Sequence, residues 1–182
     1  MAATASAANR EPPGRAGRAT DTDKAGSLKD GPHWMVETCG AVDSACTRTV
    51  CSRVWLRRYL AEIARRGLAQ QVRCESERES YKFGDGGRLL SLQRARLPVV
   101  INGGSGYLHT SVVETTAIGI LLGKDFLKDI QAELSFESDT MSSPILNLFD
   151  EKLTGKRVGH YRIDLLDGPW SPLKLSLIHI SE

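Results

Sequence analysis

Two glycine-rich turns constrain the fold more than any other feature of this 182-residue chain. The first covers residues 84–87 and the second covers residues 102–106. Glycine adopts the positive φ angles that tight hairpin tips require. Short apolar or alternating runs flank both turns, at residues 81–83, 88–92, 97–101 and 107–113. The chain after residue 67 is therefore expected to be mostly β.

A helix is expected over residues 53–66. Apolar side chains recur at helical spacing in this range, Ser52 can cap the first turn, and Gly67 can end the helix. A shorter helix is expected over residues 124–132, after a buried apolar run. Together these patterns predict a mostly β domain with one or two short helices.

Composition argues against several classes of protein. The hydrophobic share of 41% is ordinary for a globular domain, and no apolar run approaches the roughly 20 residues of a membrane span. The N-terminal residues lack the apolar core of a signal peptide, so an intracellular, cytoplasmic protein without membrane contact is expected. The net charge of +2 does not indicate direct nucleic-acid binding. The arginines crowded between residues 53 and 66 are interpreted as a solvated helix face.

The four cysteines do not predict a metal site. They stand at positions 39, 46, 51 and 74 and include no C-x-x-C pair, the common spacing of zinc ligands. Reduced thiols that pack as small apolar groups are expected instead. The sequence implies no metal ion and no organic cofactor.

The folded part of the chain is expected to lie in its middle. Residues 1–30 are rich in Ala, Gly and Arg and almost lack large apolar side chains, so a disordered linker is expected. Residues 31–150 form the expected folded domain, and residues 151–174 are interpreted as the start of a following segment. Residues 175–182 match, in order, the translation of a sequencing adapter and are interpreted as an adapter-derived tail.

Among the acidic residues, Asp43 has the sequence surroundings that most suggest a catalytic role. It follows an expected apolar strand over residues 34–42 and precedes Ser44 and Ala45. A carboxylate beside buried apolar residues loses hydration, which is costly unless the group is paired or used. Asp-Ser-Ala alone is a common sequence, so Asp43 could also simply cap the following turn.

Two further motifs follow Asp43. The first is the glycine-rich segment Phe83, Gly84, Asp85, Gly86 and Gly87. The second is Leu121, Leu122 and Gly123, at the end of an apolar run before the second expected helix. Aspartic proteases of the retroviral kind have a hydrophobic-Asp-Ser/Thr-Gly/Ala loop, a glycine-rich flap and a hydrophobic-hydrophobic-Gly motif in this order. The similarity extends to residues 43–51 and to the pairs and triplet Trp55-Leu56, Tyr59-Leu60, Leu97-Pro98 and Gly159-His160-Tyr161. With these residues included, the range 34–166 resembles the retropepsin-like protease domain of copia-type retrotransposon Gag-Pol polyproteins.

The resemblance implies a retropepsin-like closed β-barrel that is half of a homodimeric aspartic protease. Asp43 would be the catalytic residue, and Ser44 and Ala45 would complete its loop. Two Asp43 carboxylates would share one proton and activate a water molecule that attacks a peptide bond of the polyprotein. The segment 83–87 would be the flap over a peptide substrate, and residues 121–123 would support the catalytic loop. Residues 151–174 would then begin the next polyprotein segment.

Three departures from the family pattern leave an alternative open. Ala45 stands where the wider superfamily has Gly, Gly40 weakens the strand before Asp43, and Gly119 replaces a larger residue. A decayed or domesticated copy could keep the fold and lose catalysis. The alternative is therefore a catalytically inactive dimerisation or peptide-binding module.

Overall fold

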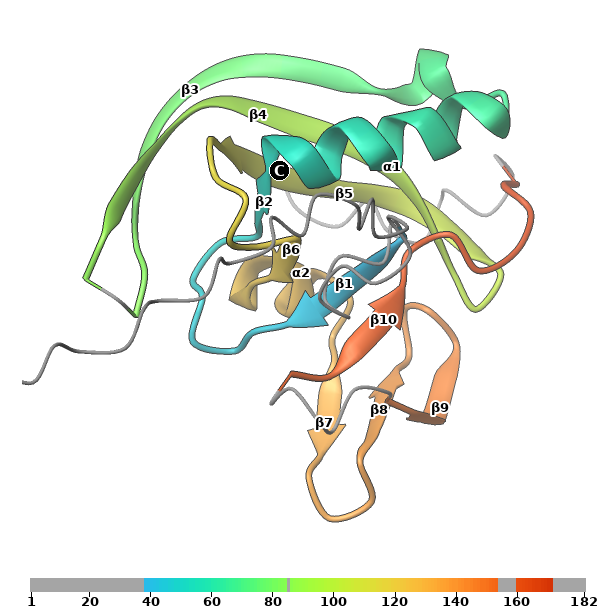
Figure 1. The fold of residues 1–182 in the computed structure, drawn as a ribbon. Helices are drawn as coiled ribbons and strands as arrows, with labels where there is room; N and C mark the ends of the chain where they lie inside the picture. Colours follow the sequence, from blue (N-terminus) through green and yellow to red (C-terminus); the bar gives the residue numbers. More distant parts are fainter. Residues whose placement is uncertain (1–37, 85, 154–159, 172–182) are drawn as a thin grey trace, which may run out of the picture. The chain divides into compact units, whose positions relative to one another are not determined.

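The computed structural model describes residues 38–84, 86–153 and 160–171. These residues form a seven-stranded sheet and a three-stranded sheet with two α-helices (Figure 1). The mostly β class expected from the sequence is confirmed. In chain order the elements are β1 (Cys39–Val42), β2 (Val50–Ser52), α1 (Arg53–Arg65), the 3-10 turn η3 (Ala69–Gln71), β3 (Arg73–Lys82), β4 (Arg88–Ile101), β5 (Gly104–Val113), β6 (Ile120–Leu122), α2 (Lys124–Asp129), β7 (Glu133–Ser135), β8 (Thr140–Ser143), β9 (Leu148–Lys152) and β10 (Arg162–Asp164).

One bridge connects the two sides of the larger sheet. Its strand order is β10-β1-β6-β2-β5-β4-β3, and β3 pairs with β4 only as far as Arg96. Beyond Arg96, the edge of β4 that faces β3 bonds instead to the segment that follows β10. Val100 N–H donates to Leu165 O at 2.8 Å, and Asp167 N–H donates to Val100 O at 2.8 Å. This single bridge links the segment after β10 to β4, so the two sides of the sheet approach each other, as in the barrel that the sequence resemblance implied.

β6 lies between β1 and β2, although it follows both in the sequence. It runs parallel to β1, with Val42 paired to Leu122, and antiparallel to β2, with Val50 paired to Leu121. The chain between β1 and β2 therefore has to pass around the end of β6. This crossing is the loop of residues 43–49, which we call the Asp43 loop (Figure 1).

The helices lie close to where the sequence predicts them. Ser52 accepts a hydrogen bond from Trp55 N–H at 3.1 Å, and Gly67 follows α1 with a φ of +70°. The rings of Trp55 and Tyr59 stack 4.7 Å apart on the buried face of α1. α2 is shorter than expected because Gln131 adopts a φ of +50°, which ends the helical path. No helix among the described residues is long and apolar enough to span a membrane.

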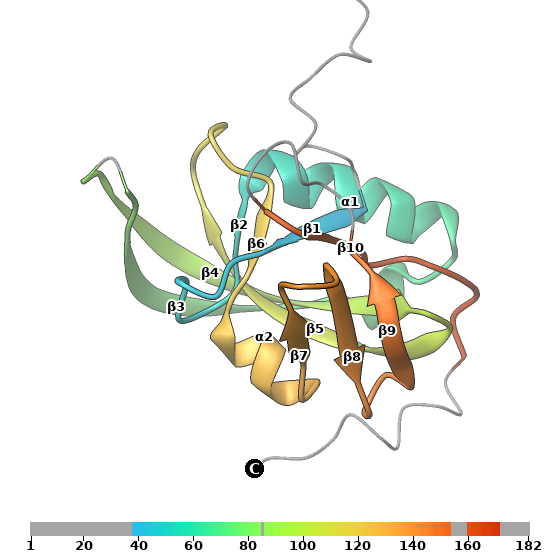
Figure 2. The same cartoon turned by 90° about the horizontal axis from the view of Figure 1, so that it is seen from below.

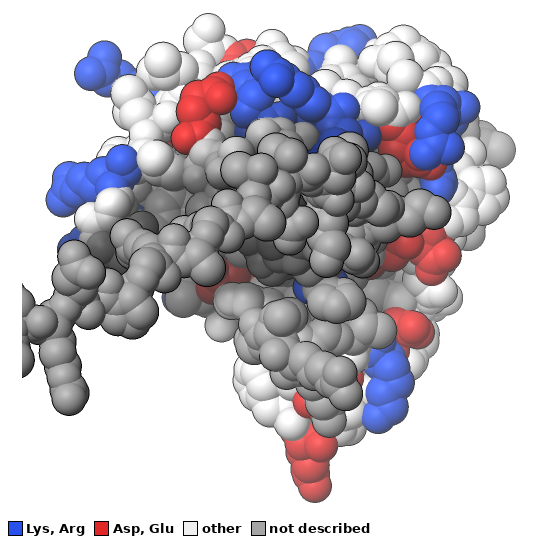
Figure 3. Space-filling view, viewed as in Figure 1, with Lys and Arg blue, Asp and Glu red and all other residues white. Residues whose placement is uncertain are grey.

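Arginines of α1 form ion pairs with nearby acids. Arg53 pairs with Glu114 at 2.9 Å, and Arg66 pairs with Glu62 at 2.8 Å. Figure 3 shows basic and acidic atoms side by side in the part of the view where α1 lies. This mixture of charges agrees with the interpretation of these arginines as a solvated helix face.

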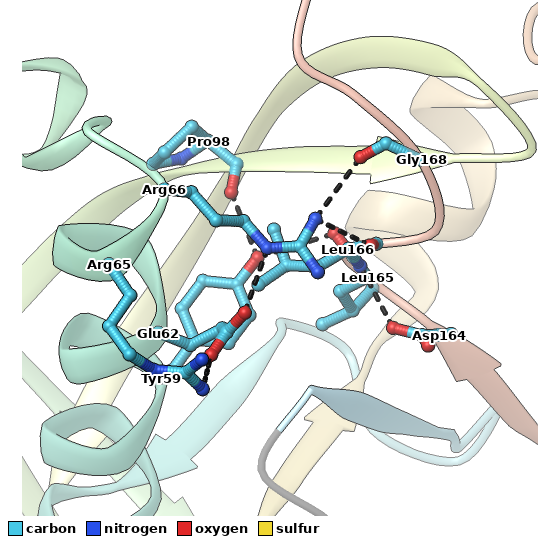
Figure 4. Close-up of polar contacts among 9 residues, drawn as sticks. All are labelled: Tyr59, Glu62, Arg65, Arg66, Pro98, Asp164, Leu165, Leu166 and Gly168. Carbon is cyan, nitrogen blue, oxygen red and sulfur yellow. Dashed lines mark hydrogen bonds and ion pairs between the residues drawn. The ribbon is translucent and has the colours of Figure 1, made fainter.

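The end of α1 holds the segment that follows β10. The Tyr59 hydroxyl lies 3.4 Å from Leu165 O, and the Arg66 guanidinium donates to Leu166 O at 2.8 Å and to Gly168 O at 3.1 Å (Figure 4). The two bonds from Arg66 satisfy the backbone carbonyls of Leu166 and Gly168. The segment is therefore a fixed part of the barrel.

Described strands continue past residue 150, the expected end of the folded domain. β9 runs across it, and β10 pairs with β1 over the register Cys39 to Asp164. Ile163 is buried in the same hydrophobic core as residues from β1 and β4. The fold therefore continues through the described residues 160–171, since an apolar core needs its last strand as much as its first. The expectations for residues 1–30 and 175–182 fall outside the described residues.

The strand expectations also change in detail. β3 is one continuous strand of which the sequence suggested only the run at 81–83, and β4 joins the two strands expected at 88–92 and 97–101. The second turn contains only Asn102 and Gly103, whose φ angles of 47° and 72° close β4 directly onto β5. β8 and β10 were not expected. Figure 2 shows β8 between β7 and β9, with α2 leading into this smaller sheet.

Candidate active site

Asp43 directly follows β1 and begins the Asp43 loop. Its backbone N–H donates to Leu122 O at 3.0 Å, which extends the β1–β6 pairing by one residue. Its carboxylate oxygen Oδ1 accepts hydrogen bonds from Ala45 N–H at 3.0 Å and from Cys46 N–H at 3.3 Å. The half-buried carboxylate is therefore held in one orientation by its own loop.

The residues after Asp43 point toward solvent or pack weakly. Ser44 and Ala45 are exposed, and Cys46 is half-buried. The Cys46 thiol donates to Arg48 O at 2.8 Å. Burial and the neighbouring charge of Asp43 raise the pKa of this thiol above its usual value. Cys46 is therefore a neutral thiol at physiological pH and a packing group of the loop.

β6 lies directly behind the Asp43 loop. Leu122 is fully buried, whereas Leu121 is half-exposed and pairs with Ala41 and Val50 on its two sides. A Cβ on Gly123 would lie 2.5 Å from the carbonyl carbon of Arg48. The three residues of the apolar-apolar-glycine motif therefore contact the strands and the loop that carry Asp43.

Gly40 has a packing role that the sequence did not reveal. A Cβ at this position would lie 2.8 Å from the side chain of Leu122. The sequence suggested that Gly40 weakens β1, but its missing side chain lets β1 pack closely against a buried leucine. The departure from the family pattern at Gly40 is therefore compatible with a tightly packed site.

Thr49 and Asp125 form a polar cluster that the sequence analysis missed. Thr49 is 1% exposed, and its N–H and its hydroxyl both donate to Asp125 Oδ1 at 2.8 Å. The Thr49 hydroxyl also accepts a hydrogen bond from Gly123 N–H at 3.0 Å. The available signal was an aspartate in the first turn of an expected helix, a position that commonly caps backbone N–H groups.

The expected flap is the tip of the β3–β4 hairpin. Phe83 N–H donates to Gly87 O at 3.0 Å, Gly86 N–H donates to Phe83 O at 2.9 Å, and Gly86 has a φ of 82°. Phe83 is half-exposed, Gly84 is exposed, and Asp85 falls outside the described residues. Figures 1 and 2 both show this tip on the same side of the barrel as the Asp43 loop.

Side chains join the hairpin to the rest of the site. Arg48 from the Asp43 loop forms an ion pair with Glu79 of β3 at 3.0 Å. The Tyr81 hydroxyl donates to Ser111 Oγ at 2.7 Å. Burial raises the pKa of Tyr81 to about 12, and the negative charges of Glu77 and Glu79 add to this shift. The base of the flap therefore lies against the loop that carries Asp43, as no local sequence pattern could show.

Three other aspartates, Asp125, Asp129 and Asp139, have settings that differ from that of Asp43. Asp125 binds Thr49, and Asp139 Oδ1 accepts a hydrogen bond from the Tyr161 hydroxyl at 2.7 Å. Asp129 is exposed on α2, and burial together with the charge of Asp125 raises its pKa. Within the described ranges no group of three or more His, Cys, Asp or Glu side chains is placed to hold a metal ion.

Comparison with known proteins gives a distant structural likeness. No protein-family model and no curated protein matches this chain significantly. Among solved structures, the chain is similar to the crystal structure of the retroviral protease-like domain of Ddi1 from Leishmania major, with 19% sequence identity and a TM-score of 0.38. The match covers 58% of this chain and 84% of that chain. So distant a likeness does not transfer functional residues to this protein.

Proposed function

We propose that this chain is one subunit of a homodimeric, retropepsin-like aspartic endopeptidase with Asp43 as its catalytic residue. One ionised Asp43 carboxylate takes a proton from a water molecule, whose oxygen attacks the carbonyl carbon of a peptide bond. The protonated Asp43 of the second copy donates a hydrogen bond to the carbonyl oxygen. The C–N bond then breaks, and a proton from the carboxyl pair goes to the departing amine.

The observation that carries this proposal is the setting of the Asp43 carboxylate. Backbone N–H groups of Ala45 and Cys46 fix its Oδ1, and β6 supports the loop from behind. Pre-oriented groups contribute to catalysis because no free energy is then needed to align them during the reaction. A residue that only capped a turn would need neither the neighbouring flap hairpin nor the packing of Gly123 against the loop.

The second catalytic carboxylate is proposed to come from a second copy of the chain. Among the described residues, Asp125 and Asp139 are engaged by other side chains, and Asp129 is exposed on α2. Ser44 and Ala45 are exposed beside Asp43 and are available to meet their symmetry mates. In the proposed dimer Ser44 hydrogen-bonds across the two-fold axis, and the Ala45 methyl group lies near that axis.

We propose an extended peptide as the substrate and the protein's own polyprotein as the natural one. The tip of the β3–β4 hairpin would close over the peptide and exclude water from the carboxylates. The support for a polyprotein substrate, for a copia-type origin and for action in the cytoplasm is the sequence resemblance alone.

Asp43→Asn tests the assignment of the catalytic residue. The amide keeps the shape of the carboxylate but cannot share a proton, so cleavage should fall by at least about 1000-fold. The measurement is cleavage of a proteome-derived peptide library, read by mass spectrometry. Asp129→Asn makes the same chemical change on an exposed position and should cleave like the wild type. Equal cleavage by Asp43→Asn and the wild type would contradict the proposal.

The same assay distinguishes an active protease from the alternative, a catalytically inactive dimerisation or peptide-binding module. A wild-type protein that binds library peptides and forms dimers, yet cleaves none over a wide pH range, would support a peptide-binding module. Ala45 is the observation that keeps this second candidate, since its methyl group has to fit where the two loops meet.

A further inference from the structure

We infer that Asp125, acting through Thr49, is a positioning residue that fixes the far end of the Asp43 loop, an inference that rests on the proposed function. The near end of the loop is held by the pairing of β1 with β6. The chain leaves the sheet after Asp43, and it returns where Ser111 N–H donates to Thr49 O at 3.0 Å, so the residues between these points need other partners.

Backbone groups at the start of α2 supply the first of these partners. Lys124 N–H donates to Cys46 O at 2.8 Å, and Asp125 N–H donates to Thr47 O at 3.2 Å. These two bonds dock the middle of the loop onto the beginning of the helix. They leave the orientation of the following residues to the side chains.

The Asp125 carboxylate provides the side-chain anchor. Its Oδ1 accepts hydrogen bonds from Thr49 N–H, from the Thr49 hydroxyl and from Phe126 N–H, each at 2.8 Å. Hydrogen bonds to a charged acceptor are shorter and stronger than neutral ones. Thr49 is therefore held at its backbone and at its side chain by one oxygen atom.

The Thr49 hydroxyl also connects Asp125 to Gly123, the residue that directly follows β6. It donates to Asp125 and accepts from Gly123 N–H at 3.0 Å, so both of its hydrogen-bonding roles are used. Gly123 itself lies against the backbone of Arg48, where a Cβ would not fit. A chain of contacts thus runs from Asp125 through Thr49 and the loop backbone to Asp43. A displaced loop would misplace the catalytic carboxylates even in a protein that stays folded.

The first test uses activity and two matched pairs of variants. Asp125→Ala and Thr49→Val should lower kcat by about 100-fold, the effect of a misplacement near 1 Å, with a smaller change in KM. Asp125→Asn keeps an oxygen acceptor and Thr49→Ser keeps the hydroxyl, so both should recover most of kcat. Asp129→Ala removes an exposed carboxylate from the same helix and should behave as the wild type.

The pH profile separates positioning from general loss of stability. Two close carboxylates that share a proton give a broad, bell-shaped profile of kcat/KM against pH, with well-separated acidic and basic limbs. In Asp125→Ala the limbs of the kcat/KM profile should move closer together, because carboxylates that lie farther apart interact less. Loss of folded protein alone would lower the whole profile without moving its limbs.

Hydrogen exchange provides a readout that does not depend on activity. The N–H groups of Ala45 and Cys46, which donate to Asp43, should exchange at least about tenfold faster in Asp125→Ala, while amides of β4 and β5 keep their protection. Unchanged exchange at both positions, or equal loss throughout the chain, would overturn the inference. If the wild type cleaves nothing, the proposed function fails, and the exchange result still decides whether Asp125 holds the loop.

Discussion

At the scale of single residues, Gly123 sets the closest packing against the Asp43 loop. A Cβ there would lie 2.5 Å from the Arg48 carbonyl carbon and 2.8 Å from Thr49 N, so backbone atoms would have to move. Gly123→Ala should lower the free energy of unfolding in urea by about 2–3 kcal/mol. Gly84→Ala is the control, because a Cβ there meets nothing within 4 Å, and its effect should stay within about 0.5 kcal/mol. Equal stability of both variants would contradict this packing.

His109 on β5 should make stability depend on pH. Burial, followed by the charges of Arg94 and Arg96, lowers the pKa of its imidazole from the usual 6.5. As the pH falls below 6.5 the unfolded chain binds a proton that the folded chain does not yet bind, so stability decreases until the lower folded pKa is passed. His109→Gln should lose less stability than the wild type between about pH 7 and about pH 5 in thermal unfolding. An identical loss in both proteins would show that His109 does not contribute.

Residue roles were predictable where they act on neighbours in the sequence. Ser52 caps the helix that follows it, and Gly67 ends the same helix, so both follow from local rules. From the sequence, Gly40 seemed only to weaken β1. The residue that explains the glycine, Leu122, lies in another strand, β6, and contacts Gly40 only in the folded protein. The role of Asp125 was not predictable, because its partner Thr49 lies far away in the sequence and no spacing rule connects the two residues.

At the scale of elements, the last strand decides where the fold ends. β10 pairs with β1, and Leu165 and Leu166 enter the barrel core. A chain of residues 31–150 lacks all of these and should not unfold cooperatively, since its core is open on one side. A chain of residues 31–174 should keep the unfolding temperature of the full protein. Cooperative unfolding of the 31–150 chain at that temperature would contradict the role given to β10.

Elements with strong local patterns were predictable, and short ones were not. α1 has helical periodicity with a cap and a stop, and the β3–β4 hairpin has a glycine-rich tip. β8 and β10 span Thr140–Ser143 and Arg162–Asp164, too short for an alternating pattern to stand out. β10 is a strand because β1 offers it a partner, and β4 then binds the residues after it. Such pairing depends on the folded sheet and is not encoded locally.

At the scale of the whole molecule, the proposed active site needs two copies of the chain. One copy presents one Asp43 loop with Ser44 and Ala45 exposed at its tip. A single carboxylate cannot act as base and acid in the same step, so a monomer should be inactive. Specific activity should therefore fall on dilution together with the sedimentation coefficient.

The most direct test of the central claim mixes wild-type subunits with an excess of Asp43→Asn subunits. Mixed dimers contain one carboxylate and one amide and cannot share a proton between two aspartates. After exchange of subunits, activity per wild-type chain should fall toward zero as the excess increases. An Asp129→Asn partner, added in the same excess, should leave the activity per wild-type chain unchanged or raise it. Activity per wild-type chain that stays constant with excess Asp43→Asn, while sedimentation shows mixed dimers, would contradict an active site built from two Asp43 carboxylates.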